Sequence, residues 1–155
     1  MMIQKHKIGE LSLLGHHMIS GQDVKVTNKK GKPNYFARLP KEYQEMLDPK
    51  DGLRWVFDFF YCQEAVVPHT DYDGLNPKAM ILPLEWSEKD TPKTIFYKQY
   101  FDDKTILDWE YNCGEIDFIS EWVIGEPIWF DTKQLHHGGE VADWKLAIVG
   151  HGHDD

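Results

Sequence analysis

A histidine and an aspartate in the middle of the chain stand where they could bind one metal ion. His69 and Asp71 lie two residues apart in the stretch 66–72, which has the composition of a strand and is followed by a turn at Asp73-Gly74. Residues two apart on a strand point to the same face, so an imidazole and a carboxylate would face the same way. A metal site needs a third ligand, and the pair His136-His137 near the end of the chain supplies a candidate.

Two histidines and one carboxylate are the ligands of a facial iron site, which leaves positions open for a bidentate co-substrate and dioxygen. Such a site benefits from a cation deep in the pocket that holds the far carboxylate of an oxo-acid. Lys145 is a candidate, because it shares one face of the apolar stretch 144–149 with Ala147 and Val149. A lysine in such a strand either faces solvent or has an anionic partner.

Short strands separated by turns predict the elements that position these residues. We expect strands at 53–62, 65–71, 78–86, 94–100, 118–123, 127–131, 135–137 and 144–149. The first two would form a hairpin or bend at Gln63-Glu64. Before them we expect one or two strands, the second at about 23–27, and a short helix at 39–47. The last residues, 151–155, have the composition of a frayed end. This pattern predicts an all-β sandwich or barrel with minor α content.

Length, charge and cysteine content limit the number of domains and the classes of partner that we expect for this protein. The 155 residues suit a single domain, 1–155, in which 1–52 form a strand and helix extension that packs on the barrel. The formal net charge of −9 argues against nucleic-acid and membrane partners. Two cysteines are too few for a disulfide scaffold. The start of the chain lacks an apolar signal region and no apolar run reaches 18 residues, so we expect a cytoplasmic protein.

The second half of the chain extends the metal-site pattern in a recognisable order. A turn and strand from Gly125 to Asp131 precede His136, and Lys145 follows nine residues after that histidine. Over about residues 53–150 the sequence resembles the 2-oxoglutarate- and iron(II)-dependent dioxygenases, in particular the small prolyl- and aspartyl-hydroxylase-like members. The resemblance implies a double-stranded β-helix, a jelly-roll barrel of the cupin type. It implies iron ligation by His69, Asp71 and His136, and 2-oxoglutarate binding by Lys145.

Several assignments within this pattern have alternatives. The family more often has arginine at the position of Lys145, and Lys98 is a second candidate for the oxoglutarate carboxylate. His137 competes with His136, and the one that is not a ligand could face the substrate. Tyr72 and Asn76, just past the ligand strand, are candidates for the pocket mouth.

The resemblance implies hydroxylation of an amino acid, a protein side chain or a small metabolite, with release of succinate and CO2. The alternatives are another metal-dependent cupin enzyme that uses no 2-oxoglutarate, and a non-catalytic β-barrel binding module. The partner would be a small-molecule or peptide substrate. The chain is short for this family, and a homodimer would cover one of its sheets.

Overall fold

Two antiparallel sheets face each other in the computed structural model, which describes residues 3–19, 23–24, 32–108 and 112–155. The large sheet has the order β1-β2-β3-β9-β4-β7 and the small sheet the order β6-β5-β8. Strands far apart in sequence are neighbours in both sheets, as in a double-stranded β-helix, so the predicted fold class is confirmed. The strands of the large sheet are β1 (Asp23–Val24), β2 (Asn34–Arg38), β3 (Arg54–Cys62), β9 (Lys145–His153), β4 (Lys78–Trp86) and β7 (Ile128–Asp131). Those of the small sheet are β6 (Ile116–Glu121), β5 (Lys93–Tyr100) and β8 (Gln134–Gly138).

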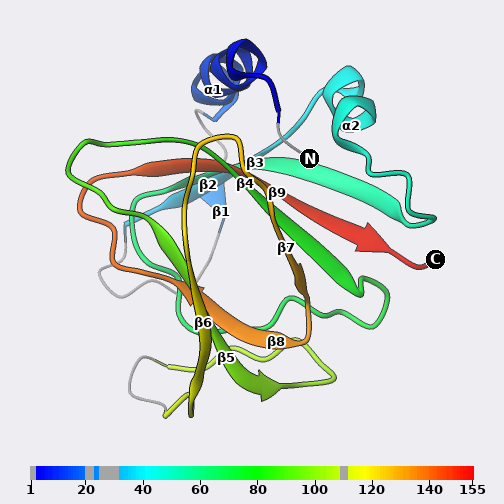
Figure 1. Cartoon of the computed structure of the whole chain (residues 1–155), viewed down its shortest axis with the longest axis vertical. Coiled ribbons are helices and arrows are strands. Elements are labelled where there is room, and N and C mark those ends of the chain that lie inside the picture. Colours follow the sequence, from blue (N-terminus) through cyan, green and yellow to red (C-terminus); the bar gives the residue numbers. More distant parts are fainter. Residues whose placement is uncertain (1–2, 20–22, 25–31, 109–111) are drawn as a thin grey trace.

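Helices α1 (Lys5–Met18) and α2 (Lys41–Leu47) cover the outer face of the large sheet, opposite the small sheet (Figure 1). The hydrophobic core lies under these helices. Period-two alternation places one set of side chains from β3, β4 and β9 in this core, and the set includes Phe57, Phe59, Leu82, Leu146 and Ile148. The alternate residues of the same strands therefore point between the two sheets, where the candidate site lies.

The N-terminal region departs from the expected strands. Residues 5–18 form helix α1, whose buried residues are Ile8, Leu11, Ser12 and Gly15. They lie on one helical face, because their spacing is three, one and three residues. The strand expected at 23–27 is described only at Asp23–Val24, and 25–27 lie outside the described residues. The helix expected at 39–47 is present as α2.

Two further expectations were wrong in part. The chain bends at Gln63-Glu64, one of the two expected alternatives, but residues 65–71 do not pair with β3 as a hairpin. His69 instead forms isolated bridges with Ile106 and His136. The side chain of Asn34 stabilises the backbone after β3: its amide oxygen accepts hydrogen bonds from the backbone N–H groups of Gln63 and Glu64. The C-terminus is not frayed through 151–153, because β9 continues to His153 between β3 and β4.

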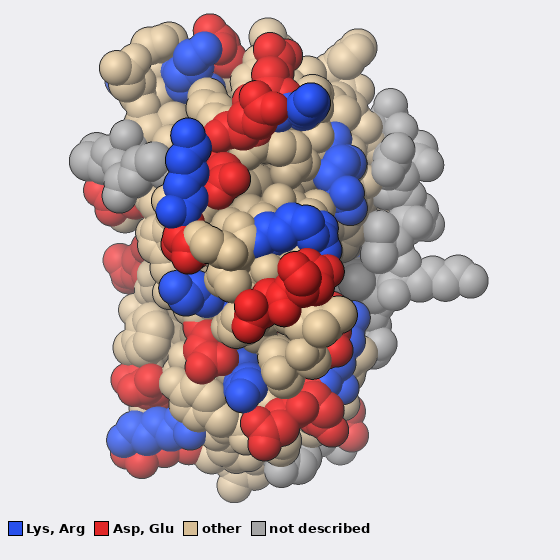
Figure 2. Space-filling view, turned by 90° about the vertical axis from the view of Figure 1, so that its right-hand side faces the viewer, with Lys and Arg blue, Asp and Glu red and all other residues tan. Residues whose placement is uncertain are grey.

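Neither helix of the described residues could span a lipid bilayer, since the longer one has 14 residues and a span needs about 20. Figure 2 shows one face of the molecule on which acidic and basic side chains are interspersed rather than gathered by sign.

Candidate metal centre

The segment that carries His69 and Asp71 is fixed between the sheets by backbone hydrogen bonds. The His69 N–H donates to the carbonyl of His136 at 2.9 Å, and the His136 N–H donates back at 3.0 Å. The Asp71 N–H donates to the Thr132 carbonyl at 2.9 Å, in the turn between β7 and β8. These bonds bring together two parts of the chain that are more than sixty residues apart.

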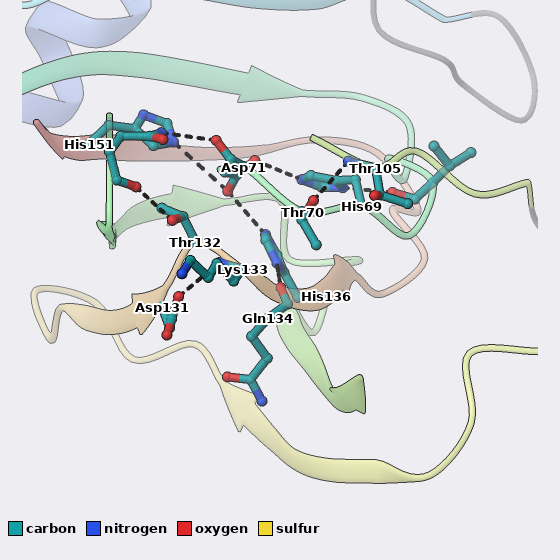
Figure 3. Close-up of polar contacts among 12 residues, drawn as sticks. His69, Thr70, Asp71, Thr105, Asp131, Thr132, Lys133, Gln134, His136 and His151 are labelled. Carbon is teal, nitrogen blue, oxygen red and sulfur yellow. Dashed lines mark hydrogen bonds and ion pairs between the residues drawn. The ribbon is translucent and has the colours of Figure 1, made fainter. Parts of the chain in front are cut away.

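The side chains of His69, Asp71 and His136 converge, with one ligand atom of each within 4.8 Å of the others. His69 Nε2 lies 3.3 Å from Asp71 Oδ1, and His136 Nε2 lies 3.3 Å from Asp71 Oδ2 (Figure 3). His136 is 4% exposed, and the side chains of His69 and Asp71 are each 21% exposed, so the three lie largely out of solvent.

The hydrogen bond of Nδ1 in each histidine determines which ring nitrogen can bind a metal. His69 Nδ1 lies 2.7 Å from the Val67 carbonyl and His136 Nδ1 lies 2.8 Å from the Gln134 carbonyl. A carbonyl oxygen only accepts, so both Nδ1 atoms carry the proton and a neutral ring presents its lone pair at Nε2. This arrangement is typical of metal-binding histidines.

Two neutral Nε2 atoms and a carboxylate would all present lone pairs to the same small space. Such a group needs a cation, or protons on the imidazoles, to be stable. Burial alone would raise the pKa of Asp71, but the adjacent His69 and His136 hold it well below its ordinary value. Burial would lower the pKa of His69, and Asp71 outweighs it and raises that pKa. The donor set, two imidazoles and one carboxylate, fits a divalent transition metal.

Alternation along β8 separates His136 from His137. His137 does not line the cavity that contains the three converging side chains, and its Nε2 lies 2.8 Å from the Tyr97 hydroxyl. Its ring also stacks on Tyr97, with centroids 5.7 Å apart. Burial lowers the pKa of His137. The structure therefore places His136 beside Asp71 and directs His137 to the other face of the small sheet.

Lys145, at the start of β9, is 4% exposed and lines the same cavity. Its Nζ lies 4.6 Å from the ring centre of Trp122, a cation–π contact. No carboxylate of the described residues forms an ion pair with it. Burial lowers the pKa of Lys145, partly offset by Cys62 and Asp90.

Two neighbours complete the surroundings of this ammonium. A Cβ on Gly138 would lie only 2.6 Å from Nζ, so glycine leaves the space that the lysine occupies. Thr94, paired with Gly138 across β5 and β8, accepts a hydrogen bond from Trp122 Nε1 at 3.0 Å. Thr94 also lines the cavity.

The structure does not bring Lys98 to this cavity. Its side chain is 55% exposed and pairs with Glu115 at 3.2 Å. Tyr72 also lies outside the cavity lining, where its ring contacts the Lys133 ammonium at 4.8 Å. Asn76 does line the cavity, but its side chain is buried and braces the turn: it accepts from the Asp73 N–H and donates to the Asp71 carbonyl.

Two histidines of the cavity lining were missing from the sequence prediction. His151 Nε2 lies 3.8 Å from Asp71 Oδ2, and His153 lines the cavity two residues further along β9. Both continue the face of Lys145, Ala147 and Val149. The alternation itself would have found them if the strand had been extended beyond residue 149.

The cavity that these side chains line has a volume of about 500 Å³, within the range of small-molecule sites. Lys145 lies at one end of the β9 face and His151 and His153 at the other, six and eight residues away. Most of the intervening lining is apolar, with contributions from Phe60, Val67, Ile81 and Ala147.

No family model and no curated protein matches this sequence. Solved structures of the same fold do match, at low identity. A prolyl-4-hydroxylase from Pseudomonas putida has a TM-score of 0.67 and 12% identity, over 98% of this chain and 89% of that one. The epimerase SnoN, in complex with Fe3+, alpha-ketoglutarate and nogalamycin RO, has a TM-score of 0.72 and 9% identity, over 98% and 76%. An oxidoreductase of the 2OG-Fe(II) oxygenase family from Burkholderia pseudomallei has a TM-score of 0.65 and 9% identity, over 99% and 81%. At these identities the likeness shows the fold.

Proposed function

We propose that this protein is an iron(II)- and 2-oxoglutarate-dependent dioxygenase that hydroxylates its substrate. One observation carries the proposal. A group of two imidazoles and one carboxylate shares a cavity with a buried lysine that has no carboxylate partner among the described residues. A metal-binding cupin without an oxo-acid co-substrate would have little use for this inward-facing cation.

His69, Asp71 and His136 would hold the iron. The Nδ1 hydrogen bonds to the Val67 and Gln134 carbonyls orient the two rings with Nε2 toward Asp71. Three protein ligands leave positions open for a co-substrate and dioxygen.

Lys145 would bind the far carboxylate of 2-oxoglutarate, with the Thr94 hydroxyl as a further donor. The lysine side chain is buried. Its ammonium contacts the Trp122 ring and occupies the space that the absence of a Cβ at Gly138 leaves. The co-substrate carboxylate and this buried ammonium would form an ion pair. The pair would offset the desolvation free energy of the unpaired Lys145 charge. The carboxylate would also raise the lowered pKa of the lysine.

Bound iron(II) with 2-oxoglutarate supplies the oxidising chemistry: one oxygen atom of O2 enters succinate as CO2 leaves, and the other converts a substrate C–H into C–OH. The chain itself orients the ligand atoms, binds the dicarboxylate and keeps water from the reacting carbon with its apolar lining.

The identities of three structurally similar proteins support the proposed activity. They are a prolyl-4-hydroxylase, an epimerase in complex with Fe3+ and alpha-ketoglutarate, and an oxidoreductase of the 2OG-Fe(II) oxygenase family. The formal charge of −9 favours a substrate that is not a nucleic acid.

Anaerobic titration of the iron(II)-loaded protein with 2-oxoglutarate tests the proposal through the weak visible charge-transfer band of the complex. We expect the band in the wild type, and succinate release when a substrate from a panel of amino acids, peptides and metabolites is added with O2. An iron-loaded protein that shows no band refutes the co-substrate. Lys145→Ala should weaken 2-oxoglutarate binding far more than iron binding, and an equal loss of both would refute the role of the lysine.

A further inference from the structure

Two aromatic side chains form part of the cavity wall on the inner face of the large sheet. Phe36 of β2 and Phe60 of β3 are opposite each other in the strand register. Their rings stack with centroids 4.6 Å apart and an interplanar angle of 26°. Both side chains are half-buried and line the cavity that contains the converging group. We call Phe36 and Phe60 the aromatic pair.

The hydrophobic core does not account for the aromatic pair. The neighbouring residues Ala37 and Phe59 point to the opposite face and are buried under the helices. Phe36 and Phe60 are absent from that core and leave part of their surface in the cavity. A half-exposed aromatic pair is stabilised when an apolar ligand covers it, and flat rings pack on it best.

The surroundings leave room for such a ring beside the pair. The register places Ala147 directly next to Phe60, and its methyl group fills little of the cavity. Two residues along each strand, on the same face but outside the cavity lining, Arg38 Nε donates to Asp58 Oδ1 at 2.7 Å. The pair therefore has an apolar surface with a polar border, and His151 adds a second polar group on the same face of β9.

On the proposed function, which this inference extends, the geometry points to a small molecule with a flat apolar ring as the substrate. The ring stacks on the aromatic pair while a polar substituent reaches His151, which lines the same cavity. A cavity of about 500 Å³ suits such a molecule together with a dicarboxylate co-substrate. A peptide substrate is the competing class.

Phenol and cyclohexanol are suitable probes, because they have the same heavy atoms and differ in the flatness of the ring. Dissociation constants are measured by ligand-observed NMR on the zinc(II)-loaded protein with 2-oxoglutarate. We expect wild type to bind phenol more tightly than cyclohexanol. Phe36→Leu and Phe60→Leu should each weaken phenol binding by roughly two- to tenfold, the value of an aromatic contact.

Tyr35→Leu is the matched control, since Tyr35 precedes Phe36 on β2 and packs on the opposite face against the core. It should leave phenol affinity unchanged. Equal affinity of wild type for the two probes, or an equal loss in Tyr35→Leu, overturns the inference. So does succinate release with peptides but with no small aromatic molecule.

Separate titration with 2-oxoglutarate distinguishes the two proposals. The aromatic-pair variants should bind 2-oxoglutarate as wild type does. Phenol binding without any 2-oxoglutarate binding would refute the dioxygenase and leave the ring site standing. Normal 2-oxoglutarate binding without a preference for phenol would refute the ring site alone.

Discussion

Replacing Lys145 with methionine tests two effects of the buried ammonium separately: its destabilisation of the folded protein and its binding of 2-oxoglutarate. Lys145 is 4% exposed, and no carboxylate of the described residues pairs with it. Replacement of a buried ion pair by apolar side chains of similar volume is often neutral or stabilising by about 1–4 kcal/mol, and we expect the same range for this buried ammonium. The lost cation–π contact with Trp122 offsets about 0.5–2 kcal/mol of that. We therefore expect the free energy of unfolding of metal-free Lys145→Met in urea denaturation to lie between about 2 kcal/mol below and about 3.5 kcal/mol above that of wild type.

The same variant should lose its co-substrate. A carboxylate left unpaired in a buried site costs about 3–5 kcal/mol, which corresponds to a loss of 2-oxoglutarate affinity of roughly a hundred- to several-thousandfold. Isothermal titration of the anaerobic iron(II) protein measures this loss. Iron affinity should remain at the wild-type level, because Lys145 is not among the converging ligand atoms.

Stability should also depend on pH in a defined direction. Burial lowers the folded-state pKa of Lys145 below its unfolded value, so the unfolded chain binds more protons between the two values. Wild-type stability therefore gains from a pH rise through that interval, and the advantage of Lys145→Met shrinks there.

Lys98→Met is the matched control, because Lys98 is 55% exposed and its pair with Glu115 lies at the surface. It should change stability by less than about 0.5 kcal/mol and leave 2-oxoglutarate binding intact. The role of Lys145 in co-substrate binding is refuted if Lys145→Met is less stable than wild type by more than about 2 kcal/mol and still binds 2-oxoglutarate. That result would make the lysine a structural residue.

Three further results should follow from the site geometry. His136→Ala should abolish stoichiometric iron(II) binding in equilibrium dialysis, and His137→Ala should retain it; the reverse result would exchange their roles. Gly138→Ala should displace the Lys145 ammonium and lower the affinity for 2-oxoglutarate at least about tenfold, as measured by calorimetry. Gly139→Ala should leave this affinity unchanged, because the added Cβ would contact only the flexible Lys93 side chain. Wild-type affinity for 2-oxoglutarate should fall as pH rises through the lowered pKa of Lys145, and a Lys145→Arg variant that shows the same fall would exclude this lysine as the titrating group.

The first helix shows why local pattern alone misassigned the N-terminus. Two members of its buried face are Ser12 and Gly15, so the face does not read as an apolar stripe. Gly15 is there because a Cβ at this position would come within 2.9 Å of the Phe59 ring. The helix is stabilised by packing on the large sheet, which a local pattern does not contain.

The C-terminal strand was shortened for a similar reason. Gly150 and Gly152 resemble the composition of a frayed end. They stand under the rings of Phe57 and Trp55, where an added Cβ would lie 2.5 and 2.7 Å away. Close approach of aromatic rings requires glycine at these two positions. Treating them as a loop hid His151, which faces Asp71.

Features that depend on neighbours along the chain could be predicted from the amino-acid sequence. Period-two alternation defined most strands, put Lys145 on the face of Ala147 and Val149, and separated the faces of His136 and His137 without saying which face is inward. Which side chains come into contact depends on the folded structure and could not be predicted in this way. Backbone bonds between His69 and His136 set one histidine beside Asp71, and the fold leaves Lys98 at the surface, where it pairs with Glu115. Contacts between strands far apart in sequence are set by packing and register, and local spacing carries no record of them.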